Sequence, residues 1–273
     1  MPVPPTPADD ERRSADRSLT PREAAAHPVA AARRRPALFA ALIVLAAAFG
    51  LGALLAVRGS QPPGIDREWM AEIIEHRNPI WEVPSLLFNA IGGGWFAVFV
   101  VPLGVLAVLL ILRRPWAALY WALACGASAG LVQLLKALFG RARPNDILVA
   151  VDPGSFPSGH TANAATLAVV LGVLLARRWV WVLGVIYVVA MMLSRTYLGA
   201  HWMTDTLGGL LIGVAVGLLG WAALAGPVER ERQRRRELAS ARFADPDRGA
   251  GRTADASAER PSRDPSPGDG GAR

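Results

Sequence analysis

The chain has one cysteine and few charged residues for its length. Charged side chains make up 19% of the 273 residues, whereas hydrophobic side chains make up 52%. Because Cys125 is the only cysteine and lies in an apolar run, a disulfide within one chain and a multi-cysteine metal site are both excluded. The charges fall mainly in the two terminal segments. This distribution is typical of an integral membrane protein.

The N-terminal segment lacks the short basic start and apolar stretch of a signal peptide, so we expect no cleavage there. The net charge of +7 would favour nucleic acid if it were clustered on a folded surface. Much of it, however, comes from residues 33–35 and 230–236, which flank apolar segments. Arginines in such places orient membrane helices. We therefore expect no nucleic-acid partner.

Several apolar runs approach the length needed to cross a bilayer, which is about 20 helical residues for a hydrocarbon core of about 30 Å. They cover residues 37–57, 92–112, 116–135, 158–176, 179–193 and 206–224. The sequence thus predicts an all-α fold, a six-span transmembrane bundle over residues 36–226. The tails at 1–35 and 227–273 are too polar to build a core and are predicted to be disordered and cytoplasmic.

The arginines predict how the bundle is oriented. They occur in both tails and in the turns at residues 113–114 and 177–178, which places those segments on the cytoplasmic side. The segment at 58–84, the segment at 139–157 and the stretch around His201 then lie outside. A few basic residues on this outer side break the rule, which indicates a task other than topology: Lys136, Arg141, Arg143 and Arg195.

His201 and Asp205 lie four residues apart where the last helix should begin, a spacing that places both side chains on one helical face. If the carboxylate accepts a hydrogen bond from one ring nitrogen, the other nitrogen keeps its lone pair for attack on a substrate. A structural hydrogen bond at the membrane interface fits the same spacing.

Ser158, Gly159 and His160 follow Pro157 at the expected start of a helix. Unpaired backbone N–H groups at such an end favour anions. Glycine lets the backbone approach a phosphate, serine offers a hydroxyl, and histidine can give a proton to a departing alkoxide. A serine cap of the helix is the structural alternative.

Lys136, Arg143 and Arg195 form a cationic set suited to a phosphoryl group. Arginine grips nonbridging oxygens with two donors while lysine adds a point charge. Pairing alone does not explain them, because the segment at 139–157 contains only Asp146 and Asp152 as acidic residues. Arginines that extend their head groups from a helix end to water are the alternative for each one alone.

Together these residues resemble the signature of the type 2 phosphatidic acid phosphatase (PAP2) superfamily. That signature has a lysine, six residues and Arg-Pro; then Pro-Ser-Gly-His; then Ser-Arg, five residues, histidine, three residues and aspartate. The chain matches it from Lys136 to Pro144, from Pro157 to His160 and from Ser194 to Asp205, with no departure at its eleven fixed positions.

The resemblance implies a metal-independent histidine phosphatase. His201 would be the nucleophile that forms a phosphohistidine, Asp205 its orienting partner, and His160 the acid that protonates the leaving group. Phosphate would be bound by Lys136, Arg143, Ser158, Gly159 and Arg195. No cofactor is expected, and the outer loops show no carboxylate cluster suited to magnesium.

The expected substrate is a membrane lipid phosphate, and phosphatidic acid, phosphatidylglycerophosphate and an isoprenoid diphosphate all fit. The expected location is the cell membrane, with the site facing the exterior or periplasm. A lipid phosphotransferase and a noncatalytic phospholipid-binding membrane protein are the alternatives. Residues 65–78 carry an apolar stripe, so we hypothesise an interfacial helix that guides the lipid, with structural packing as its alternative.

Overall fold

The computed structural model describes residues 21–59 and 61–244, and every regular element in this part of the chain is helical. The predicted all-α class is therefore confirmed. The first of two compact units ends at Glu229. The elements are α2 (Pro21–Val57), α3 (Gly64–Glu75), α4 (Pro79–Gly92), the π-helical turn η1 (Phe96–Val100), α5 (Val101–Ile111), α6 (Pro115–Phe139), α7 (Gly159–Leu175), α8 (Arg178–Tyr197) and α9 (Met203–Ala244).

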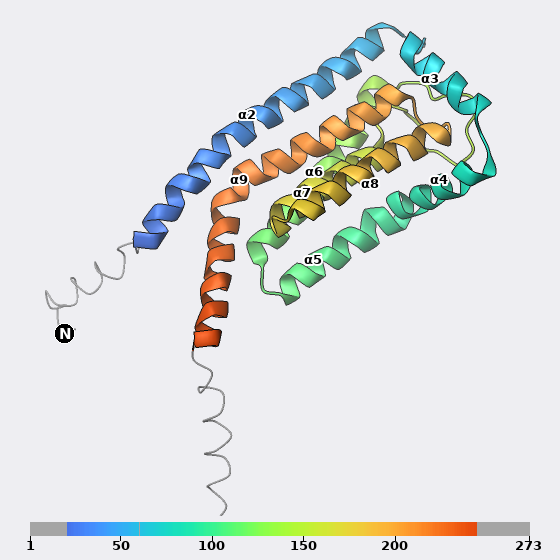
Figure 1. Cartoon of the computed structure of the whole chain (residues 1–273). Coiled ribbons are helices and arrows are strands. Elements are labelled where there is room, and N and C mark those ends of the chain that lie inside the picture. The colour runs from blue at the N-terminus through green and yellow to red at the C-terminus, as the bar shows by residue number, and fades with distance from the viewer. Residues whose placement is uncertain (1–20, 60, 245–273) are drawn as a thin grey trace, which may run out of the picture. The chain divides into compact units, whose positions relative to one another are not determined.

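Helix α7 lies at the centre of the bundle, packed against both α6 and α8 (Figure 1). Most of its residues are buried, and most of the buried side chains are small or β-branched, such as Ala162, Ala165 and Val170. Helix α4 packs on α8, α5 packs on α6, and α2 also contacts α6. Helix α3 lies across one end of the bundle and connects α2 to α4 (Figure 1). We call this end the α3 end.

The six predicted runs are all helical, but six spans are not confirmed. Within the described residues, four helices are long and apolar enough to cross a membrane: Arg34–Val57, Pro115–Phe139, Arg178–Tyr197 and Met203–Ala241. Helix α4 and the segment Phe96–Ile111 pass the same test only as a pair, with a bend of 45° between them. Helix α7 is apolar but has only 17 residues.

The run predicted at 92–112 differs from the structure at its start. It does not begin a helix at Gly92, because α4 ends there, a bend follows at Gly93, and η1 begins at Phe96. Three consecutive glycines explain the break, since glycine has low helix propensity and Gly94 adopts a positive φ of 59°.

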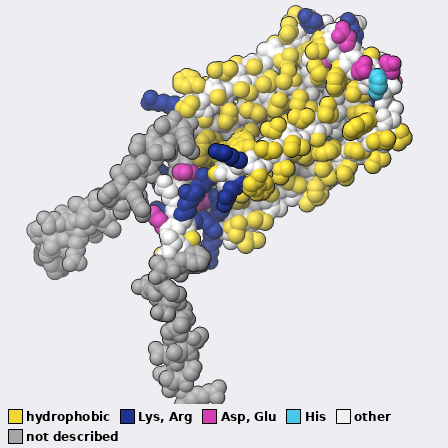
Figure 2. All heavy atoms as spheres, viewed as in Figure 1, with side chains coloured by type: hydrophobic (Ala, Val, Ile, Leu, Met, Phe, Trp, Pro, Cys, Tyr) yellow, Lys and Arg dark blue, Asp and Glu magenta, His cyan; other side chains and the backbone are white. Residues whose placement is uncertain are grey.

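Hydrophobic side chains cover the face of the bundle that Figure 2 shows. On α8, for example, Val182, Val185 and Ile186 are each more than half exposed. An apolar surface of this extent is typical of a face that meets lipid. Acidic side chains and a histidine gather at the α3 end, as Figure 2 shows.

Helix α3 coincides with most of the segment predicted as an interfacial helix. Ile65 and Ile74 are exposed, whereas Asp66 and Met70 are buried against the rest of the bundle. The helix is thus present and part of it packs, while its contact with a membrane stays a hypothesis.

Helical structure extends into both segments predicted as disordered tails. Helix α2 begins at Pro21 and α9 continues to Ala244. These extensions are rich in alanine, arginine and glutamate, which are strong helix formers even where no core is available. Residues 1–20 and 245–273 lie outside the described residues.

Close packing between α7 and α9 depends on glycines spaced four apart, Gly209, Gly213 and Gly217. A Cβ at Gly213 would meet the backbone of Ala162 and of Thr166. Small residues at this spacing allow membrane helices to approach closely. The contact begins beside Ser158, so it fixes the start of α7 against the first turns of α9.

We expect Gly213→Val to lower the thermal unfolding temperature of the detergent-solubilised protein, because overpacking a close contact costs about 1–3 kcal/mol. Gly104→Val is the matched control, since a Cβ at Gly104 meets nothing within 4 Å. Equal effects of the two substitutions would contradict the packing role of Gly213.

Candidate active site

The three sequence clusters converge on one pocket of about 620 Å³. Its polar part is formed by the last turns of α6 and α8, the segment between α6 and α7, the first turn of α7 and the residues before α9. Six predicted site residues line it: Lys136, Arg143, Gly159, His160, Arg195 and His201. Asp205 and Ser158 do not line it and are fully buried.

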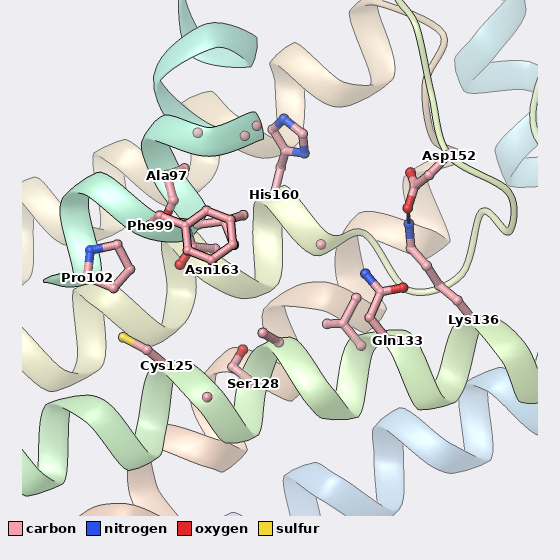
Figure 3. A pocket seen from close by; sticks show the side chains of 18 of the residues that line it. Ala97, Phe99, Pro102, Cys125, Ser128, Gln133, Lys136, Asp152, His160 and Asn163 are labelled. Atoms are coloured by element: carbon pink, nitrogen blue, oxygen red, sulfur yellow. Dashed lines mark hydrogen bonds and ion pairs between the residues drawn. The ribbon is translucent and has the colours of Figure 1, made fainter.

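The pocket continues from this polar part into an apolar part within the bundle. Figure 3 shows side chains of α6 from Cys125 to Lys136 along one wall, and Phe99 and Pro102 on the facing wall. At about 1.5 Å per residue, the α6 wall between Cys125 and Lys136 is about 16 Å long. The pocket therefore offers room for an anionic group and for an apolar chain attached to it.

His201 and Asp205 lie beside each other, but they do not share one helix, and the predicted hydrogen bond between them is not formed among the described residues. His201 lies just before α9, and its Nδ1 is 3.6 Å from Asp205 Oδ2. Asp205 occupies the first turn of α9, where its Oδ2 accepts a hydrogen bond of 2.9 Å from the backbone N–H of Trp202. This bond satisfies a donor that the helix start would otherwise leave unpaired.

Asp205 also receives two side-chain donors that sequence reasoning did not assign. Arg141 Nη1 donates to its Oδ1 at 2.5 Å, and the Ser155 hydroxyl donates to its Oδ2. The backbone N–H of Ser158 donates to the backbone carbonyl of Asp205 at 3.0 Å. Hydrogen bonds to Asp205 thus connect the start of α7 to the start of α9.

Burial lowers the pKa of His201 to about 4. Asp205 opposes this shift, whereas the positive charges of Arg143 and Arg195 add to it. The imidazole is therefore neutral at neutral pH and keeps a lone pair. Its Nε2, the nitrogen farther from Asp205, lies 3.3 Å from Arg143 Nη1.

Asp152 holds two of the predicted phosphate ligands, Lys136 and Arg143. Its Oδ2 is 2.6 Å from Lys136 Nζ, and its Oδ1 is 2.9 Å from Arg143 Nη2 (Lys136 and Asp152 are joined in Figure 3). Burial acts to raise the pKa of Asp152, but the hydrogen bond and charge of Lys136 outweigh it and the pKa is lowered. An ionised Asp152 therefore offsets the repulsion between two neighbouring cations.

His160 and Arg195 are connected through Asn89 of α4. His160 Nε2 lies 3.4 Å from the Asn89 carbonyl oxygen, and Arg195 Nη1 donates to Asn89 Oδ1. Gly93 leaves room for the His160 ring, because a Cβ at that position would overlap it. Arg195 is buried, and its Nε has no hydrogen-bond partner within the described part of the chain.

The serine cap considered for Ser158 is not present, since its side chain makes no capping hydrogen bond to α7. Its hydroxyl instead accepts a hydrogen bond of 3.3 Å from Thr161 Oγ1. Phosphate binding by Ser158 stays a prediction, while Gly159 lines the pocket directly.

Residues 117–226 match the sequence model of the family described as PAP2 superfamily. Phosphatidylglycerophosphatase B of Bacillus subtilis (strain 168) is 33% identical over 133 residues, 44% of this chain and 66% of that protein. Undecaprenyl-diphosphatase of Sulfolobus acidocaldarius is 38% identical over 80 residues, 29% of this chain and 38% of that protein. The chain thus covers just under two thirds of the first relative and well under half of the second.

A solved structure agrees with these matches. The crystal structure of a transmembrane PAP2 type phosphatidylglycerolphosphate phosphatase from Bacillus subtilis superposes with a TM-score of 0.57 at 26% identity, covering 64% of this chain and 93% of that one. Fold and site therefore define a helical membrane protein with a pocket lined by cationic side chains at the ends of its helices. Over residues 117–226 the chain belongs to the PAP2 superfamily.

Inorganic phosphate should raise the thermal unfolding temperature of the detergent-solubilised protein, because a ligand that binds only the folded state stabilises it, by about 2.7 kcal/mol at 100 times its Kd. Arg195→Gln should remove most of this stabilisation, since Arg195 presents a buried donor without a partner in the described part of the chain. Arg178→Gln, an exposed arginine at the other end of α8, is the control. Full stabilisation of Arg195→Gln by phosphate would contradict the anion site.

Proposed function

We propose that the protein is an integral membrane lipid phosphatase that hydrolyses a phosphomonoester or diphosphate of a lipid through a phosphohistidine on His201. The observation that carries this proposal is a buried, neutral imidazole beside a carboxylate, in a pocket with cations at one end and apolar walls at the other. The family and the names of the relatives support the same class of reaction.

The proposal gives each ring nitrogen of His201 a role, and the geometry supports it. Nδ1 faces Asp205, so Nε2 is the atom that attacks phosphorus. As the N–P bond forms, the bond from phosphorus to the leaving oxygen breaks, and His160, protonated beside the bound anionic phosphate, gives its proton to that oxygen. Water then attacks the phosphohistidine, His160 takes a proton from this water, and phosphate leaves with His201 restored.

The cations lower the barrier by meeting charge that grows on the phosphoryl oxygens. Arg143 lies nearest to the attacking nitrogen, and Lys136 and Arg195 line the same pocket. Because Asp152 and Asn89 hold these side chains before substrate arrives, little reorganisation is needed in the transition state. Gly159 and Ser158, at the N-terminal end of α7, are the remaining proposed phosphate ligands.

The apolar part of the pocket favours a lipid over a water-soluble phosphate ester. It is lined by residues such as Phe99, Leu103 and Leu106, which a hydrocarbon chain can contact. Phosphatidic acid, phosphatidylglycerophosphate and an isoprenoid diphosphate are the proposed substrates. The names of the relatives fit two of these classes, a phosphatidylglycerophosphate and an undecaprenyl diphosphate.

We place the pocket on the exterior or periplasmic side of the cell membrane and both termini in the cytoplasm. The arginine-bearing turns at 113–114 and 177–178 precede α6 and α8, whose opposite ends reach the pocket. Arginine-rich turns belong on the cytoplasmic side, which supports this orientation.

A phosphate-release panel in detergent, with EDTA present, tests the function. We expect release from at least one lipid phosphate or diphosphate, and we expect His201→Ala to abolish it because no other group supplies the attacking lone pair. His76→Ala is the control, since His76 is an exposed residue at the end of α3. Normal turnover by His201→Ala would refute the proposed nucleophile, and loss of wild-type activity in EDTA would refute metal independence.

The same panel distinguishes the alternatives. A phosphotransferase would pass the phosphoryl group to an added hydroxyl acceptor in preference to water, so transferred phosphate would exceed free phosphate. A noncatalytic lipid-binding protein would bind the lipid phosphates and release no phosphate from any of them.

The pH dependence of kcat/KM gives a separate prediction. His201 must be unprotonated to attack, and burial lowers its pKa to about 4. The value of kcat/KM should therefore fall as the pH is lowered through about 4. Around neutral pH, ionisation of His201 should not change kcat/KM, because the imidazole is already unprotonated there. An acid limb near the ordinary histidine value of 6.5 would contradict the buried, neutral imidazole.

A further inference from the structure

A buried charge network connects α3 to the candidate site. Arg141 Nη2 is 2.7 Å from Asp66 Oδ2, and Arg141 Nη1 is 2.5 Å from Asp205 Oδ1. Both carboxylates are fully buried, and the Arg141 side chain is only 9% exposed. One guanidinium is thus shared by two carboxylates that come from segments far apart in the sequence.

Asp66 also holds the first turn of α9. Its Oδ1 accepts a hydrogen bond of 3.0 Å from the backbone N–H of Thr204, and its Oδ2 accepts one of 2.6 Å from the Thr204 hydroxyl. Thr204 Oγ1 in turn contacts Arg141 Nη1 at 2.8 Å. Through these contacts the Asp66 carboxylate lies beside Thr204, the residue that precedes Asp205.

The charges in this network leave a net negative charge of one, because two carboxylates face one guanidinium. In the proposed reaction, His201 becomes positively charged when it bonds to phosphorus, and a buried positive charge needs a compensating partner. With Arg141 alone, the charge of Asp205 would be fully neutralised. Because Arg141 also pairs with Asp66, a net negative charge remains beside His201.

We propose that Asp66 and Arg141 are positioning residues that act through Asp205 and set the net charge next to His201. This inference rests on the proposed function. Arg141 holds Asp205 in place and supports its ionised form. Asp66 shares the Arg141 guanidinium, so Arg141 does not fully neutralise the negative charge of Asp205.

Other charged or titratable groups also face His201, and none of them is substituted in the variants below. Arg143 lies at 3.3 Å, and the positive charge of Arg195 and the ring of His160 face it across the pocket. Asp152 is bound to Arg143 and Lys136 on the same side. A shift caused by changing Asp66 or Arg141 therefore reports on the network alone.

The test is a comparison of Asp66→Asn, Arg141→Gln and the double variant. Asp66→Asn removes an anion, so it should lower the pKa of His201 and move the acid limb of kcat/KM to lower pH. Arg141→Gln removes a cation, so it should raise the pKa of His201 and move the acid limb of kcat/KM to higher pH. Each single variant should lose roughly tenfold or more in kcat, a size of effect typical of coupled neighbours.

The double variant restores the net charge of the network and should recover part of the lost kcat, with an acid limb near that of the wild type. A merely structural role predicts a double variant at least as impaired as the worse single variant, and this result would overturn the proposal. Acid limbs of kcat/KM that move in the same direction in both single variants would also overturn the proposal. Glu68→Gln and Arg67→Gln, exposed neighbours on α3, are the controls for charge and for helix position.

Direct titration of His201 separates this inference from the proposed function. Nuclear magnetic resonance of protein labelled at its histidines, assigned with His201→Ala, measures the pKa of His201 without turnover. If the pKa of His201 shifts in opposite directions in the two single variants and returns in the double variant, the network is supported even if no lipid phosphate is hydrolysed. An unchanged pKa of His201 in the single variants overturns the network. Activity that survives His201→Ala would instead show that the proposed function is wrong.

Discussion

The buried carboxylate of Asp205 is the point on which the candidate site depends. A buried carboxylate is costly unless its oxygens receive donors, and here they receive Arg141, Ser155 and the backbone of Trp202. Because these donors come from the segment before α7 and from the start of α9, satisfying one charge also fixes two helix starts. His201 then lies between this carboxylate and the cations of the pocket, which is the position that a proposed nucleophile requires.

The remainder of the site follows from the same need to pair charges where water is scarce. Asp152 holds Lys136 and Arg143 together, and Asn89 connects Arg195 to His160. Each cation thus keeps its place before a phosphate binds. The apolar walls along α6 and α5 extend the pocket away from these charges, and this division between a charged end and an apolar interior matches the chemistry of a lipid phosphate.

The sequence predicted the all-α class and six of the residues around the pocket, because apolar runs of spanning length and short motifs are local signals. It did not predict the roles of Asp66 and Asn89, because they act through contacts with residues 138 and 106 positions away. Arg141 stood out only as a basic residue on the outer side, and its shared carboxylates could not be seen from spacing. The glycines at 92–94 carried a signal for the break between α4 and η1, but their apolar surroundings concealed it.

The most direct test of the account is to trap the covalent intermediate. Protein mixed with a lipid phosphate carrying labelled phosphorus is quenched in alkali, where phosphohistidine survives, and peptides are mapped by mass spectrometry. The account predicts the label on His201, with more of it in His160→Ala if His160 also activates water in the second step. Label on another residue, or steady turnover in His201→Ala, would contradict the central claim that this imidazole attacks phosphorus.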